Sequence, residues 1–97
     1  MCYTLSVRFE WDPKKAASNL RKHRVSFHEA ATVLEDPLST TFPDPDHSVT
    51  EKRFLTIGQS SSGSILVVAH ADRGKAVRLI SARRATRSER RFYEEDA

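Results

Sequence analysis

The second half of the chain contains three adjacent strand-like segments, at residues 52–59, 64–72 and 76–83. The first two are joined by the turn sequence Ser-Ser-Ser-Gly, and the last two by Asp-Arg-Gly-Lys. Connections this short link neighbouring strands that run antiparallel. The middle segment contains Ile-Leu-Val-Val-Ala, a run of successive apolar residues that predicts a strand central in the sheet or covered on both faces. The chain is therefore constrained to an antiparallel meander around this strand.

The first part of the chain combines a strand with a helix. Polar and apolar side chains alternate over residues 5–10, which predicts a strand with one buried face. Asp12 is a favourable N-cap and Pro13 a favourable first helical residue, so a helix is predicted over residues 13–23. Cationic residues in its last turn suit the negative end of the helix dipole, which is a structural reason for the Lys-His-Arg triplet at 22–24.

A second short helix should follow and form a hairpin with the first. Ser26 and Glu29 have the spacing of a capping box, and apolar residues recur at helical spacing until Asp36–Pro37 ends the pattern. The next segment, to residue 50, is rich in Pro, Ser, Thr and Asp, and only residues 40–42 are predicted as a short edge strand.

The last element is a C-terminal helix directly after the meander, since Thr86 and Glu89 form a further capping-box pair. The order is then βααββββα, and 97 residues suffice for one domain only. We expect a single α+β domain over residues 1–97, in which an antiparallel sheet packs against the N-terminal helical hairpin. The helices should cover one face of the sheet.

Arginine is concentrated near the C-terminus, where six of the eleven arginines lie between Arg78 and Arg91. The C-terminal helix has its arginines early and its acidic residues at the end, the reverse of what the helix dipole favours. Such placement favours an anionic partner, and the net charge of +3 with a pI near 9.4 agrees. The alternative is that Arg90–Glu94 and Arg91–Glu95 are ordinary surface ion pairs.

The composition argues against metal or disulfide chemistry. Cys2 is the only cysteine, no zinc-site spacing occurs, and no apolar stretch approaches the length of a membrane span. The acidic cluster at residues 44–51 lacks the ligand spacing of a calcium loop and is interpreted as turn chemistry. No cofactor, no metal and no membrane contact are expected, and the protein should reside in a reducing cytoplasm.

Cleavage of RNA without a metal requires a base for the 2′-hydroxyl, an acid for the departing 5′-oxygen, and cations for the charge on phosphorus. The residues that could fill these roles are Glu51 or His23 as base, His23, Lys22 or Tyr93 as acid, and Arg53 with Arg83 as phosphate clamp. His70 lies in an apolar strand and is interpreted as a hydrogen-bonded structural residue. Trp11 is interpreted as a core residue.

Three separated segments together resemble the BrnT family of toxins: FEWDPKKAASNLRKHRVSFHEA, the Glu51–Arg53 unit, and RLISARRATRSERRFY. The resemblance extends from Phe9 to Tyr93. It implies a fold similar to the RelE-like toxins and an endoribonuclease of a type II toxin-antitoxin module that arrests growth. It also implies a BrnA-like antitoxin, joined in a heterotetramer, through which alone DNA would be contacted.

The family's motifs fall on residues in three groups, which are Trp11, Asp12, Asn19, Lys22, His23, Ser26 and Phe27, then Glu51, Arg53 and Gly58, then Ser81, Ala82, Arg83, Ala85, Glu89, Arg90 and Tyr93. Since several of these have capping roles, the catalytic candidates are Lys22, His23, Glu51, Arg53, Arg83 and Tyr93. The candidates for RNA binding are Arg24, Arg78, Arg84, Arg87, Arg90 and Arg91.

One departure from the family pattern concerns Arg24, where the family usually has glycine at the end of the helix. Either Arg24 adopts the left-handed cap at a cost of about 1 kcal/mol, or the helix ends differently and shifts His23. Because a shifted His23 could not serve catalysis, the alternative hypothesis is a non-catalytic module that binds nucleic acid or the antitoxin and acts in operon repression.

Overall fold

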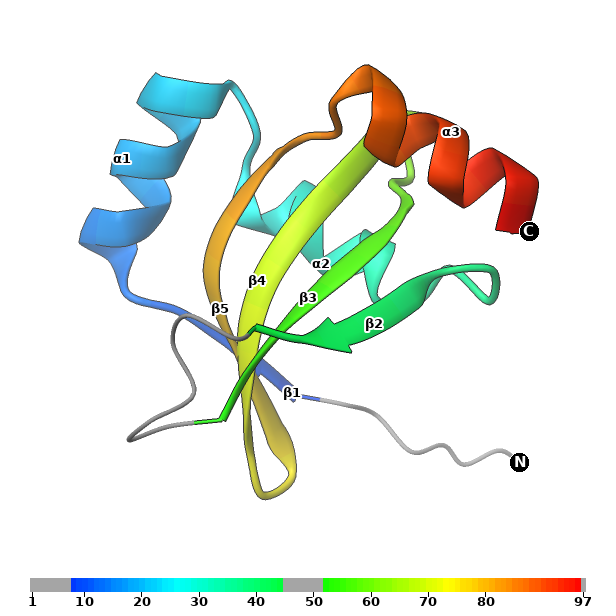
Figure 1. Cartoon of the computed structure of the whole chain (residues 1–97). Coiled ribbons are helices and arrows are strands. Elements are labelled where there is room, and N and C mark those ends of the chain that lie inside the picture. Colours follow the sequence, from blue (N-terminus) through cyan, green and yellow to red (C-terminus); the bar gives the residue numbers. More distant parts are fainter. Residues whose placement is uncertain (1–7, 45–51, 97) are drawn as a thin grey trace.

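A five-stranded sheet with the order β1-β5-β4-β3-β2 forms the centre of the computed structural model, which describes residues 8–44 and 52–96 (Figure 1). The strands are β1 (Arg8–Glu10), β2 (Thr40–Pro43), β3 (Arg53–Gln59), β4 (Ile65–Arg73) and β5 (Ala76–Arg84). The helices are α1 (Pro13–His23), α2 (Phe27–Val33) and α3 (Arg87–Asp96). In these residues no helix has the length and apolar character needed to cross a membrane.

The predicted meander is confirmed. Strands β2 to β5 are successive antiparallel neighbours, and β4 has a partner on each side. Leu66 and Val68 are buried with residues of α2, whereas Val67 between them is buried with Tyr93 of α3. The apolar run in β4 is thus explained, because both faces of this strand are covered.

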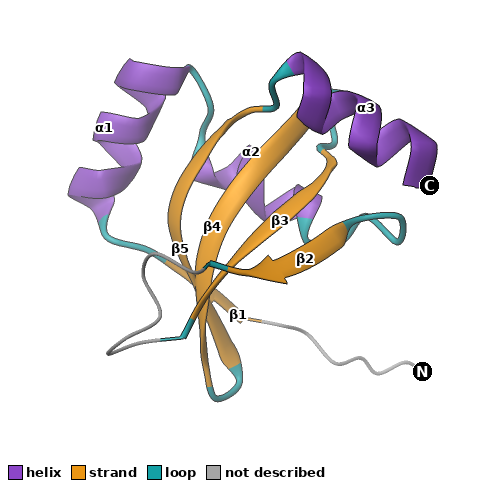
Figure 2. Ribbon diagram, viewed as in Figure 1, coloured by secondary structure: helices purple, strands orange, loops and turns teal. Residues whose placement is uncertain are grey.

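Two features of the fold differ from expectation. β1 runs parallel to β5, with Phe9 opposite Val77, so the sheet is not antiparallel throughout. No tight turn connects these two strands, so nothing local imposes an antiparallel pairing. The helices also lie on both faces of the sheet: α1 and α2 cover one, here called the hairpin face, and α3 packs on the other, the α3 face (Figure 2).

The position of α3 follows from burial. α2 already covers the hairpin face, while Ile57 and Val67 leave an apolar patch on the opposite side of the same strands. Tyr93 fills this patch, and Phe92 lies against Phe42 of β2 with a ring centroid separation of 5.6 Å. The expectation of helices on a single face is therefore wrong.

The predicted helix starts are largely confirmed. The Asp12 carboxylate accepts a hydrogen bond from the Lys14 N–H at 2.8 Å, and the Ser26 hydroxyl accepts one from the Glu29 N–H at 3.0 Å. The Glu29 side chain does not return to its own helix start. Its carboxylate accepts hydrogen bonds from the Ser60 and Ser62 hydroxyls at 2.7 and 2.5 Å, and so ties the β3–β4 turn to α2.

Arg24 takes the left-handed conformation, with φ 59° and ψ 29°, and its N–H donates to the Leu20 carbonyl at 2.9 Å. It is the one non-glycine residue with positive φ in the part of the chain that the structure describes. The helix therefore ends as a glycine cap would end it, and His23 keeps its place as the last residue of α1. The conformation costs about 1 kcal/mol.

Candidate nucleic-acid interface

Arginines occupy both ends of the α3 face. Arg83 lies opposite Val67, and Val67 is buried against Tyr93 of α3. Arg53 and Arg78 both lie opposite Ala71, one on each side of β4. Directly opposed residues in a sheet share a face, so Arg53 and Arg78 flank the small Ala71 on one rung. Two strand spacings separate their backbones, or roughly 10 Å.

The register does not bring Arg53 and Arg83 together. Their partners on β4 are Ala71 and Val67, which are separated by about 13 Å along the strand at a rise of roughly 3.3 Å per residue. The expectation that these two arginines form one phosphate clamp therefore does not match the register. Arg53 instead shares the rung of Ala71 with Arg78.

Arg83 makes a bidentate ion pair with Glu89 in the first turn of α3. Its two terminal nitrogens donate to the two carboxylate oxygens at 2.8 and 3.0 Å. The hydrogen bond and ion pair from Arg83 hold the pKa of Glu89 down at about 2, and Glu89 in turn raises the pKa of Arg83. The Arg83 side chain remains 42% exposed, so its other donors can still reach a ligand.

Glu89 also closes the predicted capping box of α3. Its carboxylate accepts from the Thr86 N–H at 2.9 Å, while the Thr86 hydroxyl accepts from the Glu89 N–H at 3.2 Å. One carboxylate therefore starts the helix and orients the arginine at the end of β5. This arrangement joins β5 to α3 and fixes the direction of the Arg83 guanidinium.

Tyr93 is buried, and its hydroxyl donates to Asp36 Oδ2 at 2.6 Å. This hydrogen bond, with burial, raises the pKa of Tyr93 to about 12. The structure does not support the expectation that Tyr93 protonates the leaving group, because a phenol held by a carboxylate is a poor proton donor. Its contacts are those of an anchor for α3.

Asp36 also organises the chain around this anchor. Its carboxylate accepts from the Gln59 N–H at 2.8 Å and the Leu38 N–H at 2.9 Å. A Cβ at Gly58 would lie 2.9 Å from the Ser39 Cβ and 3.2 Å from Asp36 Oδ2, so this approach needs glycine. Sequence reasoning missed Asp36, although a carboxylate just after a helix is a signal for such local hydrogen bonding.

Asn19 fixes the end of α1 to β5. Its side-chain amide donates to the Ala82 carbonyl at 2.8 Å and accepts from the Ala82 N–H at 3.0 Å, as a neighbouring strand would. The same amide nitrogen donates to the Val25 carbonyl at 2.9 Å. Because His23 lies one turn after Asn19, the C-terminal end of α1 is held beside the strand that carries Arg83.

The remaining candidates are largely on the surface. The side chains of Lys22, His23, Arg24, Arg84, Arg87, Arg90 and Arg91 are exposed. In the described residues no ion pair joins Arg90 to Glu94 or Arg91 to Glu95, so the alternative of surface pairs is not realised there. Glu51 lies outside the described residues, as do Asp46 and His47 of the acidic segment.

His70 is a structural residue, as predicted. It is buried, its Nε2 lies 2.8 Å from the Thr56 hydroxyl, and its ring stacks on Phe54. Burial lowers its pKa, which keeps the imidazole neutral. Trp11 packs against the hairpin-face core, with its ring 5.9 Å from that of Phe27.

The fold and the charge distribution together define a small α+β protein with Arg53, Arg78 and Arg83 on one sheet face and further exposed arginines on α1, on α3 and at the end of β5. The family model described as "Ribonuclease toxin, BrnT, of type II toxin-antitoxin system" matches residues 11–89. The chain therefore belongs to the BrnT family of ribonuclease toxins. Membership of this family implies an RNA target and an antitoxin partner.

A solved structure supports the same assignment. The crystal structure of the Brucella abortus ribonuclease toxin BrnT matches with a TM-score of 0.67 and 25% sequence identity, over 84% of this chain and 100% of that one. A search of curated proteins gave no match. The predicted α+β architecture and the resemblance stated from the sequence are both confirmed.

Proposed function

We propose that this chain is a metal-independent endoribonuclease that cleaves RNA through the substrate's own 2′-hydroxyl and thereby arrests growth. The observation that carries the proposal is the orientation of Arg83 by Glu89, with part of the guanidinium still exposed. A fixed cation of this kind costs no reorganisation when charge develops on phosphorus.

In the proposed reaction the 2′-oxygen attacks phosphorus and the 5′-oxygen leaves. A base removes the 2′-hydroxyl proton and an acid returns a proton to the 5′-oxygen, so the products carry a 2′,3′-cyclic phosphate and a 5′-hydroxyl. We assign charge stabilisation to Arg83 and proton transfer to His23, with Lys22 and Glu51 as the other candidates. Arg53 and Arg78 would bind a flanking phosphate.

The arrangement of α1 supports this assignment. Asn19 holds α1 against β5 at Ala82, the residue before Arg83. His23 and Lys22 are exposed in the last turn of α1, near the end of β5 that carries Arg83.

The proposal is tested with purified protein and a structured RNA in the presence of EDTA. Cleavage should persist, and the products should carry cyclic phosphate ends. Arg83→Ala should lower the rate by at least about 100-fold, as loss of a transition-state donor does, while Arg21→Ala should cleave normally. RNA that stays intact with and without added metal, at micromolar protein, would exclude the enzymatic reading.

A second candidate is a non-catalytic module that binds nucleic acid or the antitoxin and acts in operon repression. The pairing of Arg83 with Glu89 favours it, because a carboxylate already occupies two of the arginine's donors. This candidate requires salt-dependent RNA binding without cleavage and normal growth when the chain is expressed alone.

For the partner we propose a BrnA-like antitoxin that contributes carboxylates or an apolar helix against the arginine-rich surface. The complex would be a heterotetramer built on an antitoxin dimer, in the cytoplasm, and only the antitoxin would contact DNA. Light scattering of the coexpressed pair tests this stoichiometry, and a one-to-one heterodimer would contradict it.

A further inference from the structure

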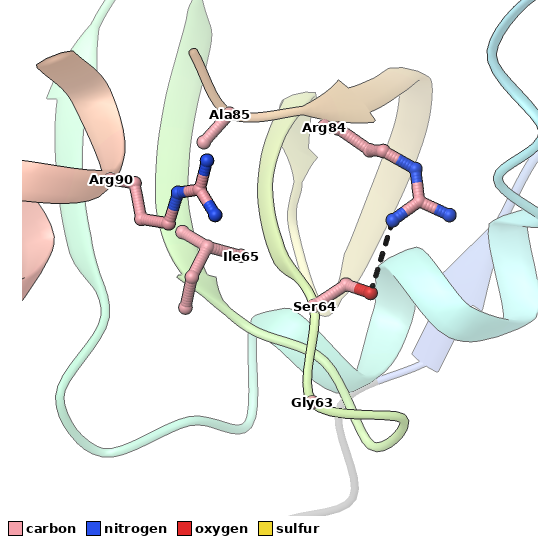
Figure 3. Close-up of a pocket in the computed structure, with 6 residues that line it drawn as sticks. All are labelled: Gly63, Ser64, Ile65, Arg84, Ala85 and Arg90. Carbon is pink, nitrogen blue, oxygen red and sulfur yellow. Dashed lines mark hydrogen bonds between the residues drawn. The ribbon is translucent and has the colours of Figure 1, made fainter. Parts of the chain in front are cut away.

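A pocket of about 260 Å³ lies between the end of β5 and α3. Figure 3 shows Arg84 and Arg90 on opposite sides of it, with Gly63 and Ser64 of the β3–β4 turn close by. Ile65 and Ala85 contribute apolar surface beside the Arg90 guanidinium, and the Arg84 guanidinium points toward Ser64. The pocket lies at the same end of β5 as the proposed catalytic arginine, since Arg84 follows Arg83 in the chain.

The charge of this pocket is not balanced from within. No carboxylate lines it, and the nearby carboxylates of Glu29 and Glu89 are engaged by serine hydroxyls and by Arg83. Arg84 makes a long contact of 3.4 Å to the Ser64 hydroxyl and attracts the Glu29 carboxylate, which lies outside the pocket lining. In the described residues the Arg90 guanidinium has no ion pair or hydrogen bond. Two arginines thus face one cavity without a counter-ion inside it.

A second pocket shows the contrast. It measures about 270 Å³ and contains Arg78, but Glu10 and Asp12 line it as well. Those carboxylates offset the charge of Arg78 within that pocket, whereas the pocket between Arg84 and Arg90 combines two cations with no acidic residue in its lining.

The turn at the edge of the pocket is held in place before any ligand binds. The Ser60 N–H donates to the Ser64 carbonyl at 2.8 Å, and the Ser61 N–H donates to the Thr32 hydroxyl at 2.8 Å. The Glu29 carboxylate accepts from Ser60 and Ser62 on the other side of the turn. A site held in this way loses little conformational entropy on binding.

We propose that this pocket is a subsite for one nucleotide of single-stranded RNA. Arg84 and Arg90 hold the phosphate, and the base lies against Ile65 and Ala85 with an arginine plane stacked on it. The inference rests on the proposed function, since it places this nucleotide next to the phosphate that Arg83 would contact.

The first test measures binding of a fluorescent 2′-O-methyl RNA hexamer, which cannot be cleaved through its 2′-oxygen. Arg84→Ala and Arg90→Ala should each weaken binding about tenfold and lower the slope of log affinity against log salt by about 0.7. The matched control Arg21→Ala removes the same charge from exposed α1 and should leave affinity near that of the unaltered chain.

A second variant removes no charge. Ala85→Leu fills the pocket while both arginines stay, and it should also weaken hexamer binding, with an unchanged melting temperature showing that the fold is intact. By NMR, adenosine 5′-monophosphate should shift the amide signals of Gly63, Ser64 and Ile65. Adenosine without phosphate should not.

The outcomes separate this inference from the proposed function. If RNA is cleaved normally and the three pocket variants bind the hexamer like Arg21→Ala, the subsite is wrong while the ribonuclease proposal stands. If the monophosphate binds in the pocket but no RNA is cleaved, the subsite stands and the enzymatic proposal fails. Variants that lose only antitoxin binding would also overturn the subsite.

Discussion

The two faces of the sheet are held together by different forces. On the hairpin face, eight buried residues form a continuous apolar core, and several of them are completely buried. Within the described residues, the buried cluster on the α3 face has only three members, and the polar contacts that join α3 to the sheet side include Tyr93 with Asp36 and Glu89 with Arg83. The arginine-rich surface is thus built on the more weakly packed side, which is also sensitive to pH and salt.

The largest expected loss of stability comes from a substitution in the core of the hairpin face. Phe27 is 2% exposed and packs in the hairpin-face core, so Phe27→Ala should lower the free energy of unfolding by about 3–5 kcal/mol. Urea denaturation measures this loss. Native-state hydrogen exchange should show the amides of α3 exchanging before those of α2. Equal protection of the two helices would remove the distinction between the faces.

A smaller effect is expected for Tyr93→Phe. The ring still fills the apolar patch, but Asp36 loses a donor at 2.6 Å, which should cost about 1–2 kcal/mol. Because the pKa of Tyr93 is raised to about 12, its hydrogen bond stabilises the fold fully below pH 10. That contribution is lost as the pH rises from 10 to 12. Alkaline unfolding followed by far-UV circular dichroism should therefore show a loss of stability between pH 10 and 12 that is present in the unaltered chain and absent in Tyr93→Phe. Phe27→Ala, which is less stable than the unaltered chain, should begin to unfold at lower pH than that chain.

The ion pair between Glu89 and Arg83 should fail at the opposite end of the pH range. The pKa of Glu89 is lowered from 4.5 to about 2, so its contribution is present above pH 4.5 and is lost as the pH falls toward 2. Because Arg83 is 42% exposed, we expect no more than about 1 kcal/mol from this pair. Glu89→Gln should remove that share of the acid dependence, measured by urea denaturation at pH 2 to 5.

Glu89→Gln also tests whether the orientation of Arg83 matters for RNA cleavage. With the carboxylate gone, Arg83 keeps its charge but loses its bidentate partner. RNA binding should then be retained or strengthened while cleavage falls, because the guanidinium is no longer held in one direction. Cleavage at the unaltered rate would show that Glu89 serves only the capping of α3.

Local signals in the sequence predicted much of the fold. The short turns and the apolar run of β4 specified the meander, and Asp12, Ser26 and Thr86 marked the three helix starts. The parallel pairing of β1 with β5 joins segments far apart in the chain, and no turn encodes it. The face that α3 covers depended on an apolar patch formed only when β3 and β4 are paired.

The candidate site was harder to predict, for a similar reason. Glu89 has the spacing of a capping residue, but its carboxylate has enough acceptor capacity to bind Arg83 as well, and only the folded chain brings the two together. Asn19 was a motif residue without a role until β5 was placed beside it. Arg53 and Arg83 were both correctly predicted to lie on strands, but the register between those strands decided that they lie apart.

The smallest expected change in stability concerns Arg24, at the end of α1 on the hairpin face. Its φ of 59° is unfavourable for arginine and costs glycine little, so Arg24→Gly should raise the free energy of unfolding by about 0.5–1 kcal/mol. Since α1 already ends in the conformation that glycine favours, His23 should not move and RNA cleavage should proceed at a similar rate. Arg24→Ala is the matched control, because it removes the charge and keeps the strain. If both variants bind RNA more weakly, the charge of Arg24 contributes to RNA binding. If Arg24→Gly alone cleaves RNA faster, the left-handed conformation of Arg24 limits the placement of His23.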